Sequence, residues 1–216
     1  MKTFFFLLLP ILNVMVTSFS YKICIVGAGS RLGRELAFQG LTDYNSSILG
    51  LTNSDTFIEE PYRGDGFNEI PSTKKMSFPN LKIDNYWSYI PDNYEHLILC
   101  TGAGPFEKDY SDKLTAKMLQ SLPSRCRSIN LVSAWGTGDS LSQSDWGIQI
   151  MNSWYLQDTY RAKNEQERMI QEFQGDIEKR IYRVKALSFG NTFLESTSRY
   201  DLASEILENI FLLENK

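Results

Sequence analysis

The stretch YKICIVGAGSRLG, from Tyr21 to Gly33, decides the fold. Its first half is a continuous apolar run of strand length, and it passes directly into a glycine-rich turn. The residues that follow, up to Gln39, carry apolar side chains at helical spacing, and Gly40 is suited to end a helix. A strand, a glycine turn and a helix in this order predict the first half of a βαβ unit, and therefore a parallel sheet.

The glycine turn also has the composition of a pyrophosphate-binding site. Gly27 permits a tight turn, the small residues that follow let backbone N–H groups approach a phosphate, and Gly33 lets the helix pack closely on the sheet. A turn with a purely structural role is the alternative. The expected cofactor contacts in this segment are Gly27, Gly29, Ser30, Arg31, Leu32 and Gly33.

Strands and helices alternate along most of the remaining chain. Further strands are expected at 47–51, 76–78, 96–100, 128–132 and 180–187. Helices are expected from Ser111 or Asp112 to Leu122, through Lys163 to Phe173, and at the end of the chain, with irregular segments at 52–80 and 137–153. This pattern predicts an α/β fold: a Rossmann-type, doubly wound parallel sheet of six or seven strands in a three-layer α/β/α arrangement.

Composition narrows the possible functions. The chain has 216 residues and a formal net charge of -4, which gives no electrostatic reason to expect nucleic acid as a partner. Its three cysteines are expected to be reduced thiols in the core. His96 is the only histidine and no Cys/His cluster has metal-ligand spacing, so no metal site is expected.

The first residues have the layout of a targeting leader. Lys2 precedes an apolar run from Phe4 to Val16, which Pro10 interrupts and which small residues follow. The run is short for a transmembrane helix, so we expect cleavage after Ser18 and no stable membrane span afterwards. Residues 1–18 are thus assigned to the leader and 19–216 to one domain. The leader resembles those of algae with secondary plastids, which implies the secretory route and possible delivery to that plastid.

Four segments together resemble the atypical short-chain dehydrogenase/reductase family. The turn has the family spacing G-x-x-G-x-x-G with Ser30 at the middle glycine. Ser133 follows a strand, as the family's active-site serine does, and Lys163 precedes Glu167 as in the family's Ala-Lys-x-x-x-Glu helix. The segment from Ser198 to Ala203 resembles the one that opens the family's last helix. The resemblance extends over nearly all of residues 19–216.

The resemblance implies catalytic roles for Ser133, Tyr160 and Lys163. In the family a tyrosine transfers the substrate proton, a lysine lowers the tyrosine pKa and holds the nicotinamide ribose, and a serine positions the carbonyl. The expected tyrosine position, four residues before Lys163, is here Thr159, whereas Tyr160 is three residues before it. One residue turns a helical side chain by about 100 degrees, so the role of Tyr160 is left open.

The resemblance implies a nicotinamide dinucleotide, and the residues after the second strand and in the turn favour NADP, with NAD as the alternative. No acidic residue directly follows the second strand to bind a ribose 2′-hydroxyl, and Thr52 and Asn53 are expected to line the cofactor site there. Arg31 in the turn is suited to a 2′-phosphate. Asp84 is a candidate for contact with adenine. The turn after the 96–100 strand supplies the last expected contacts, Thr101, Gly102 and Ala103.

The sequence therefore favours an NAD(P)H-dependent oxidoreductase that acts on an unknown small carbonyl or conjugated compound. The alternative is a non-catalytic NAD(P)-binding redox sensor or assembly factor, which the shifted tyrosine favours. A sugar-nucleotide epimerase is disfavoured, because such enzymes carry a larger C-terminal substrate domain. Trp135, Trp146 and Trp154 are candidates for the floor of an apolar substrate pocket, with core packing as the alternative.

Overall fold

The computed structural model describes residues 21–53, 58–61, 74–89, 91–102, 108–144, 146–150, 154, 156–184 and 198–214. The expected leader, residues 1–18, lies outside this part of the chain, so its cleavage and the plastid destination stay predictions. Ala103 also lies outside the described residues.

The centre of the fold is a parallel sheet with the strand order β3-β2-β1-β4-β5-β6. Its six strands are β1 (Tyr21–Val26), β2 (Ile48–Thr52), β3 (Leu81–Asn85), β4 (Tyr94–Leu99), β5 (Ser128–Ala134) and β6 (Glu178–Val184). All five strand pairs are parallel. After β3 the chain crosses back over the sheet to β4, which lies beside β1, so the order reverses between β1 and β4.

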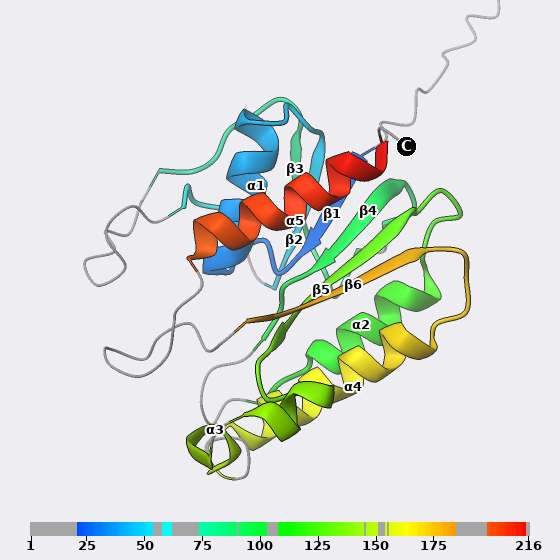
Figure 1. Ribbon diagram of the computed structural model, residues 1–216. Coiled ribbons are helices and arrows are strands. Elements are labelled where there is room, and N and C mark those ends of the chain that lie inside the picture. Colours follow the sequence, from blue (N-terminus) through cyan, green and yellow to red (C-terminus); the bar gives the residue numbers. More distant parts are fainter. Residues whose placement is uncertain are drawn as a thin grey trace, which may run out of the picture.

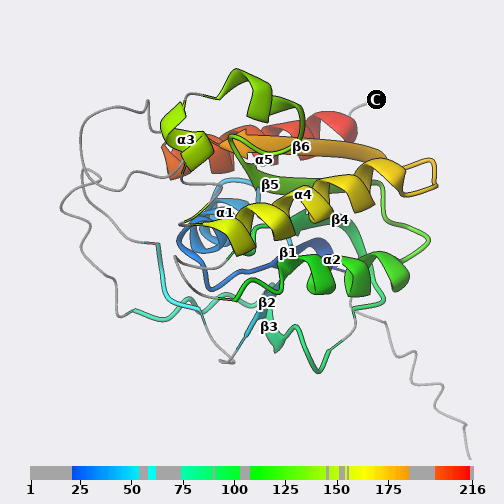
Figure 2. The ribbon, with the colours of Figure 1, turned by 90° about the horizontal axis from the view of Figure 1, so that it is seen from below.

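Helices cover both faces of the sheet. On one face α1 (Arg31–Thr42) packs against α5 (Arg199–Glu214), and on the other α2 (Ser111–Gln120) packs against α4 (Gln157–Glu172) (Figures 1 and 2). A short 3-10 helix, η1 (Gly138–Gln143), and the short α3 (Trp146–Ile150) follow β5. The expected three-layer, doubly wound Rossmann-type fold is confirmed.

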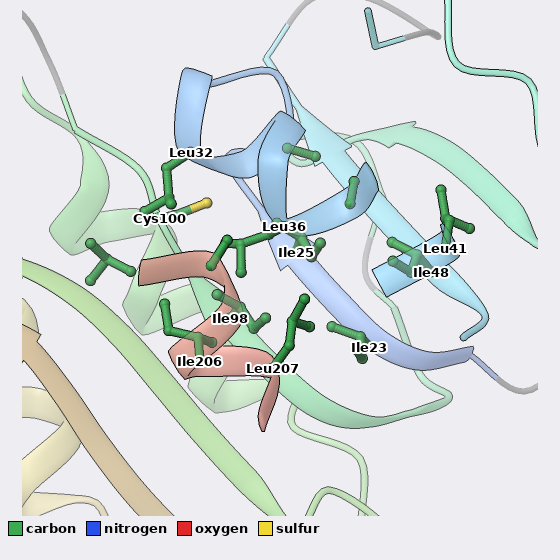
Figure 3. Close-up of a cluster of buried hydrophobic side chains, with 14 of the residues drawn as sticks. Ile23, Ile25, Leu32, Leu36, Leu41, Ile48, Ile98, Cys100, Ile206 and Leu207 are labelled. Carbon is green, nitrogen blue, oxygen red and sulfur yellow. The ribbon is translucent and has the colours of Figure 1, made fainter. Parts of the chain in front are cut away.

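Each face of the sheet has its own apolar core. Beneath α1 and α5, Ile23, Ile25 and Ile98 from the sheet pack with Leu36 and Leu207 from the helices (Figure 3). A second cluster beneath α2 and α4 contains Leu97, Leu131, Met118 and Ile170 among others. The central strands β1, β2 and β4 are largely buried on both sides, which explains why apolar residues predominate in them.

Several expected elements are displaced. The strand expected at 76–78 is absent; instead the third strand is β3, at 81–85, and Met76 donates its N–H to Ile58 O at 2.9 Å beside an isolated bridge between Glu59 and Lys75. Within the expected loop 137–153 the structure has η1 and α3. The last strand begins two residues early, at Glu178, and its described part ends at Val184.

The three cysteines, Cys24, Cys100 and Cys126, are free and buried, as expected. Burial raises the pKa of Cys100 and of Cys126 to about 11, so both stay protonated thiols at neutral pH. None of the helices in the described ranges is long and apolar enough to cross a membrane.

Candidate functional site

A cavity of about 400 Å³ opens at the carboxyl ends of β1, β2 and β4. It lies where the strand order reverses, which is the position at which open α/β sheets bind ligands. Its lining includes seven residues expected from the sequence: Gly27, Gly29, Ser30, Thr52, Asn53, Thr101 and Gly102. Three segments far apart in the sequence are therefore brought together as the resemblance implied.

The glycines of the turn have three different environments. A Cβ at Gly27, where φ is +91°, would lie 2.9 Å from Cys100 O, and a Cβ at Gly33 would lie 2.2 Å from Gly27 O. Neither position accepts a side chain without moving the backbone. A Cβ at Gly29 would meet nothing closer than Thr52 Cγ2 at 3.6 Å, and this residue lines the cavity. Gly29 therefore leaves open the space that a phosphate needs for close backbone approach.

Ser30 begins α1 at the edge of the cavity. Its hydroxyl accepts a hydrogen bond from Gly33 N at 3.0 Å, so it caps the helix. The first turn of the helix points its backbone N–H groups, and the positive end of its dipole, towards the cavity end of the sheet. The other three residues of the turn that were expected to contact the cofactor do not line the cavity: Arg31 is exposed, and Leu32 and Gly33 are buried.

Four lining residues were missed by the sequence analysis: Arg34, Ile58, Glu59 and Tyr86. Arg34 Nη1 forms an ion pair with Glu59 Oε2 at 2.6 Å, and Arg34 Nε donates to Gly29 O at 3.0 Å. Arg34 follows the last glycine of the turn directly, which is the one signal that could have pointed to it. Ile58 and Glu59 lie in a segment without hydrophobic periodicity, so no pattern placed them at the site.

Asn85 and Lys117 support the cavity wall near the end of β3 through hydrogen bonds to Asn53 and Tyr86, which line it. Asn85 Nδ2 donates to Asn53 O at 2.7 Å, which ties the end of β3 to the end of β2. Lys117, on α2, donates to Tyr86 O at 2.7 Å and to Trp87 O at 2.8 Å, so it holds the turn that carries Tyr86 into the cavity wall. Asp84 does not line the cavity; its carboxylate pairs with Lys82 at 3.3 Å.

Lys163 lies behind the wall formed by Thr101 and Gly102. It is buried and donates hydrogen bonds to Thr101 O and, at 3.0 Å, to Val132 O. A Cβ added to Gly102 would lie 3.8 Å from Lys163 Cε. Burial lowers the pKa of Lys163 to about 8, against the opposing effect of the negative charge of Asp109 and other groups. The side chain of Lys163 thus lies directly behind Gly102, and its ammonium group loses its proton at a lower pH than that of an ordinary lysine.

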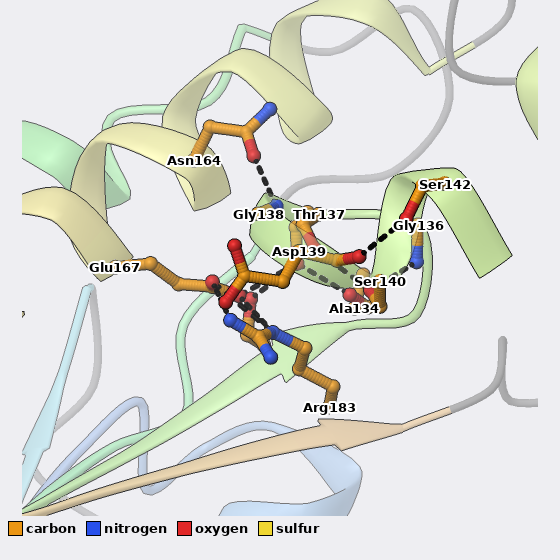
Figure 4. A network of polar contacts seen from close by, with 11 residues as sticks. Ala134, Gly136, Thr137, Gly138, Asp139, Ser140, Ser142, Asn164, Glu167 and Arg183 are labelled. Atoms are coloured by element: carbon orange, nitrogen blue, oxygen red, sulfur yellow. Dashed lines mark hydrogen bonds and ion pairs between the residues drawn. The ribbon is translucent and has the colours of Figure 1, made fainter. Parts of the chain in front are cut away.

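Ser133 is buried near the end of β5, beside a polar network that includes Thr137, Glu167 and Arg183 (Figure 4). Its hydroxyl lies 3.1 Å from Thr137 Oγ1, which donates to Glu167 Oε1 at 2.6 Å. Glu167 also accepts hydrogen bonds from Arg183, and the closest of these, from Nη2 to Oε2, is 2.7 Å long. Burial alone would raise the pKa of Glu167, but hydrogen bonds from Arg183, Ser133 and Thr137 hold it below its ordinary value.

Tyr160 lies one turn before Lys163 on the buried face of α4. Its hydroxyl donates to Trp135 O at 3.1 Å, just after the end of β5, and burial raises its pKa. The structure therefore gathers Ser133, Tyr160 and Lys163 around residues 132–135, while the hydroxyls of Ser133 and Tyr160 already interact with protein groups. Trp146 and Trp154 are about three-quarters exposed, at 77% and 76%, so neither is packed in the core.

The residues present fit a dinucleotide. The space left at Gly29, the helix start at Ser30 and the cavity volume suit a pyrophosphate and its attached nucleoside. Among the described residues, no group of three or more His, Cys, Asp or Glu side chains is arranged to hold a metal ion.

The strand order and the glycine-turn cavity define a Rossmann-type α/β domain of the dinucleotide-binding architecture. No protein-family model matches the sequence, and no curated protein matches it significantly. Solved structures do match the fold. A short-chain dehydrogenase/reductase from Veillonella parvula, in complex with NADP, has a TM-score of 0.57 at 14% identity, with 88% of each chain covered.

Two further neighbours have similar scores. ChuY, an anaerobillin reductase from Escherichia coli O157:H7, has a TM-score of 0.55 at 13% identity, covering 87% of this chain and 89% of its own. A Rossmann-fold NAD(P)-binding family protein from Shigella flexneri has a TM-score of 0.50 at 11% identity, covering 89% and 87%. At these identities the likeness establishes the fold expected from the resemblance.

Proposed function

We propose that the chain is an NAD(P)H-dependent oxidoreductase of the short-chain dehydrogenase/reductase type, acting on a small carbonyl or conjugated compound. The observation that carries the proposal is the cavity at the strand-order reversal, with Gly29 open to it and the start of α1 at its edge. The neighbours described as a complex with NADP and as a reductase support it.

In this proposal the glycine turn binds the pyrophosphate, and the ends of β2 and β3 receive the adenosine. Thr52, Asn53 and Tyr86 line the cavity on that side, and Arg34 supplies a positive charge suited to NADP. Lys163 lies next to the opposite wall and is the group proposed to hold the nicotinamide ribose. The bound cofactor would supply the hydride.

The proton would come from Tyr160, with Ser133 as the second hydroxyl at the same end of β5. For this Tyr160 must exchange its hydrogen bond to Trp135 O for one to the substrate. Geometry in a ligand-free active site often tightens only when substrate is bound, so the present contact is compatible with a catalytic role.

A second candidate function is a non-catalytic NAD(P)-binding sensor or assembly factor. The specific observation in its favour is that the Tyr160 and Ser133 hydroxyls are engaged by Trp135 O and Thr137 Oγ1. Both candidates require nicotinamide binding, and only the first requires turnover.

The test has two stages. Titration of the protein with NADPH and NADH, followed by calorimetry or nicotinamide fluorescence, measures binding. A panel of aldehydes, ketones and conjugated compounds is then screened by following NADPH oxidation. Binding with turnover supports the oxidoreductase, tight binding without turnover supports the sensor, and absence of binding contradicts both.

A further inference from the structure

Arg34 is a cation in the cavity wall, and it is already paired. Its guanidinium contacts Glu59 through Nη1 at 2.6 Å and Gly29 O through Nε at 3.0 Å. Both Arg34 and Glu59 line the cavity together with Asn53, at the end of β2 where the adenosine ribose is proposed to lie. A negative charge is therefore built into the corner that a 2′-phosphate would enter.

The backbone around Glu59 is anchored on both sides, so its carboxylate is held at this place. Ile58 and Met76 are buried in the core beneath α1, and Met76 N donates to Ile58 O. Glu60 N donates to Lys74 O at 2.8 Å, and Glu59 forms a bridge with Lys75. These contacts hold the segment that presents Glu59 against the start of α1.

We propose that Glu59 is a specificity-determining residue that lowers the preference for NADP(H) by competing with the 2′-phosphate for Arg34. The inference rests on the proposed function. To bind a 2′-phosphate, Arg34 must break its ion pair with Glu59 or contact both anions at once. The phosphate would then lie close to the negative charge of Glu59, which repels it. The free 2′-hydroxyl of NAD(H) meets no such repulsion, and it can donate a hydrogen bond to the carboxylate of Glu59.

The Arg34–Glu59 ion pair is partly buried, which strengthens its electrostatic interactions. The Arg34 and Glu59 side chains are 16% and 31% exposed, so the pair is less screened than the ion pairs on the outer face of α4. An arginine guanidinium binds carboxylates and phosphates alike, so a 2′-phosphate would compete with Glu59 for the N–H donors of Arg34. The protein is then expected to bind both nicotinamide cofactors. Its affinity for NADP(H) is expected to be lower than it would be if Arg34 had no carboxylate partner.

The experiment measures the dissociation constants of NADPH and NADH for the wild type and three variants. Glu59→Gln keeps the shape of the side chain and removes its charge. This variant is expected to bind NADPH roughly tenfold more tightly than the wild type, and to bind NADH equally well or more weakly. Arg34→Gln is expected to lower the affinity for NADPH more than the affinity for NADH. Adenosine 2′,5′-bisphosphate and 5′-AMP, which lack nicotinamide, are expected to reproduce the same difference.

Glu60→Gln is the matched control. Glu60 is the adjacent residue, its carboxylate pairs with Lys74 at 2.8 Å, and it does not line the cavity. It loses the same charge, so an equal change in the NADPH to NADH ratio would mean a general charge effect and would overturn the proposal. An unchanged ratio in Glu59→Gln would also overturn it while leaving the proposed function intact. If neither cofactor binds any of the four proteins, the proposed function fails and this inference fails with it.

Discussion

A Cβ on Gly33 would lie 2.2 Å from the carbonyl oxygen of Gly27, whereas one on Gly29 would lie no closer than 3.6 Å to Thr52. Two glycines of one turn thus have opposite reasons for being glycine. Gly33 is needed by the fold, because the helix packs directly on the turn. Gly29 is not crowded by the protein, and the space beside it belongs to the cavity.

This contrast gives the first prediction. Gly29→Val is expected to weaken nicotinamide binding by at least ~10-fold, since the new side chain occupies the space proposed for the pyrophosphate. Its free energy of unfolding should stay close to that of the wild type. Gly33→Ala should instead unfold at lower denaturant concentration. Unchanged NADPH affinity in Gly29→Val, measured by titration, would mean that the turn has only a structural role.

The second prediction concerns the carboxylate of Glu167. Glu167 is 3% exposed and Arg183 is 22% exposed, so removing the negative charge leaves a partly buried cation without its partner. Glu167→Gln is therefore expected to lower the free energy of unfolding by about 3 kcal/mol at neutral pH. Glu165→Gln is the control on the same helix: it breaks an exposed pair with Arg168 and should cause no resolvable change.

The same pair has a defined pH dependence. The folded-state pKa of Glu167 lies below its ordinary value, so the unfolded state binds the proton more readily. Its contribution to stability is fully present above the ordinary glutamate pKa of about 4.3 and is lost as the pH falls through the folded-state value. The difference between wild type and Glu167→Gln should shrink in acid. A constant difference in denaturation curves across that range would contradict the assignment.

The extent to which the sequence predicted the fold follows from burial. β1, β2, β4 and β5 are largely buried, and the apolar residues that they carry made each of them recognisable in the sequence. β3 lies at one edge of the sheet, and in its sequence LKIDN only Leu81 and Ile83 are apolar, so its apolar signal was too weak. The sequence analysis placed the strand at Met76 instead. Met76 is buried, but it pairs with Ile58 outside the sheet.

The residues of the candidate cofactor site also differ in how clearly the sequence indicated them. Gly27, Gly29 and Ser30 lie in the short turn between a strand and a helix, so the local sequence pattern indicated them. Glu59 and Tyr86 reach the cavity only because distant segments pack beside α1 and β2, and no local pattern encodes that packing. The sequence analysis named Arg31 as the candidate for a 2′-phosphate because it lies within the turn, and it did not consider Arg34. In the structure Arg31 is exposed and Arg34 lines the cavity.

The third prediction follows from the lowered pKa of Lys163. An ordinary lysine stays charged to about pH 10, but burial brings Lys163 to a pKa of about 8. If its ammonium group holds the ribose, NADPH affinity should fall as the pH rises through that value, because a neutral amine makes weaker hydrogen bonds. A decrease of about fivefold is expected between about pH 7 and about pH 9.5.

Lys163→Met tests this origin. The variant should bind NADPH more weakly at neutral pH and should lose the dependence between those two pH values. Lys113→Met, which changes an exposed lysine on α2, should keep the wild-type profile. A wild-type profile that is flat up to about pH 10 would show that Lys163 does not act on the cofactor through its charge.

The last prediction separates the reductase from the sensor, since an enzyme of this kind needs a proton donor and a binding protein does not. Tyr160 does not line the cavity, so Tyr160→Phe should leave NADPH affinity within about twofold of the wild type, while turnover should fall by ~100-fold for a lost general acid. The substitution also removes the donor to Trp135 O, and a loss of about 1 kcal/mol in the free energy of unfolding is expected. Circular dichroism and denaturation therefore accompany the kinetics, so that a lower rate is not confused with unfolded protein. A Tyr160→Phe variant with full turnover would remove this hydroxyl from the mechanism. If the wild type binds NADPH tightly and reduces nothing in the panel, the contacts of Tyr160 with Trp135 and of Ser133 with Thr137 are structural, and the sensor becomes the better proposal.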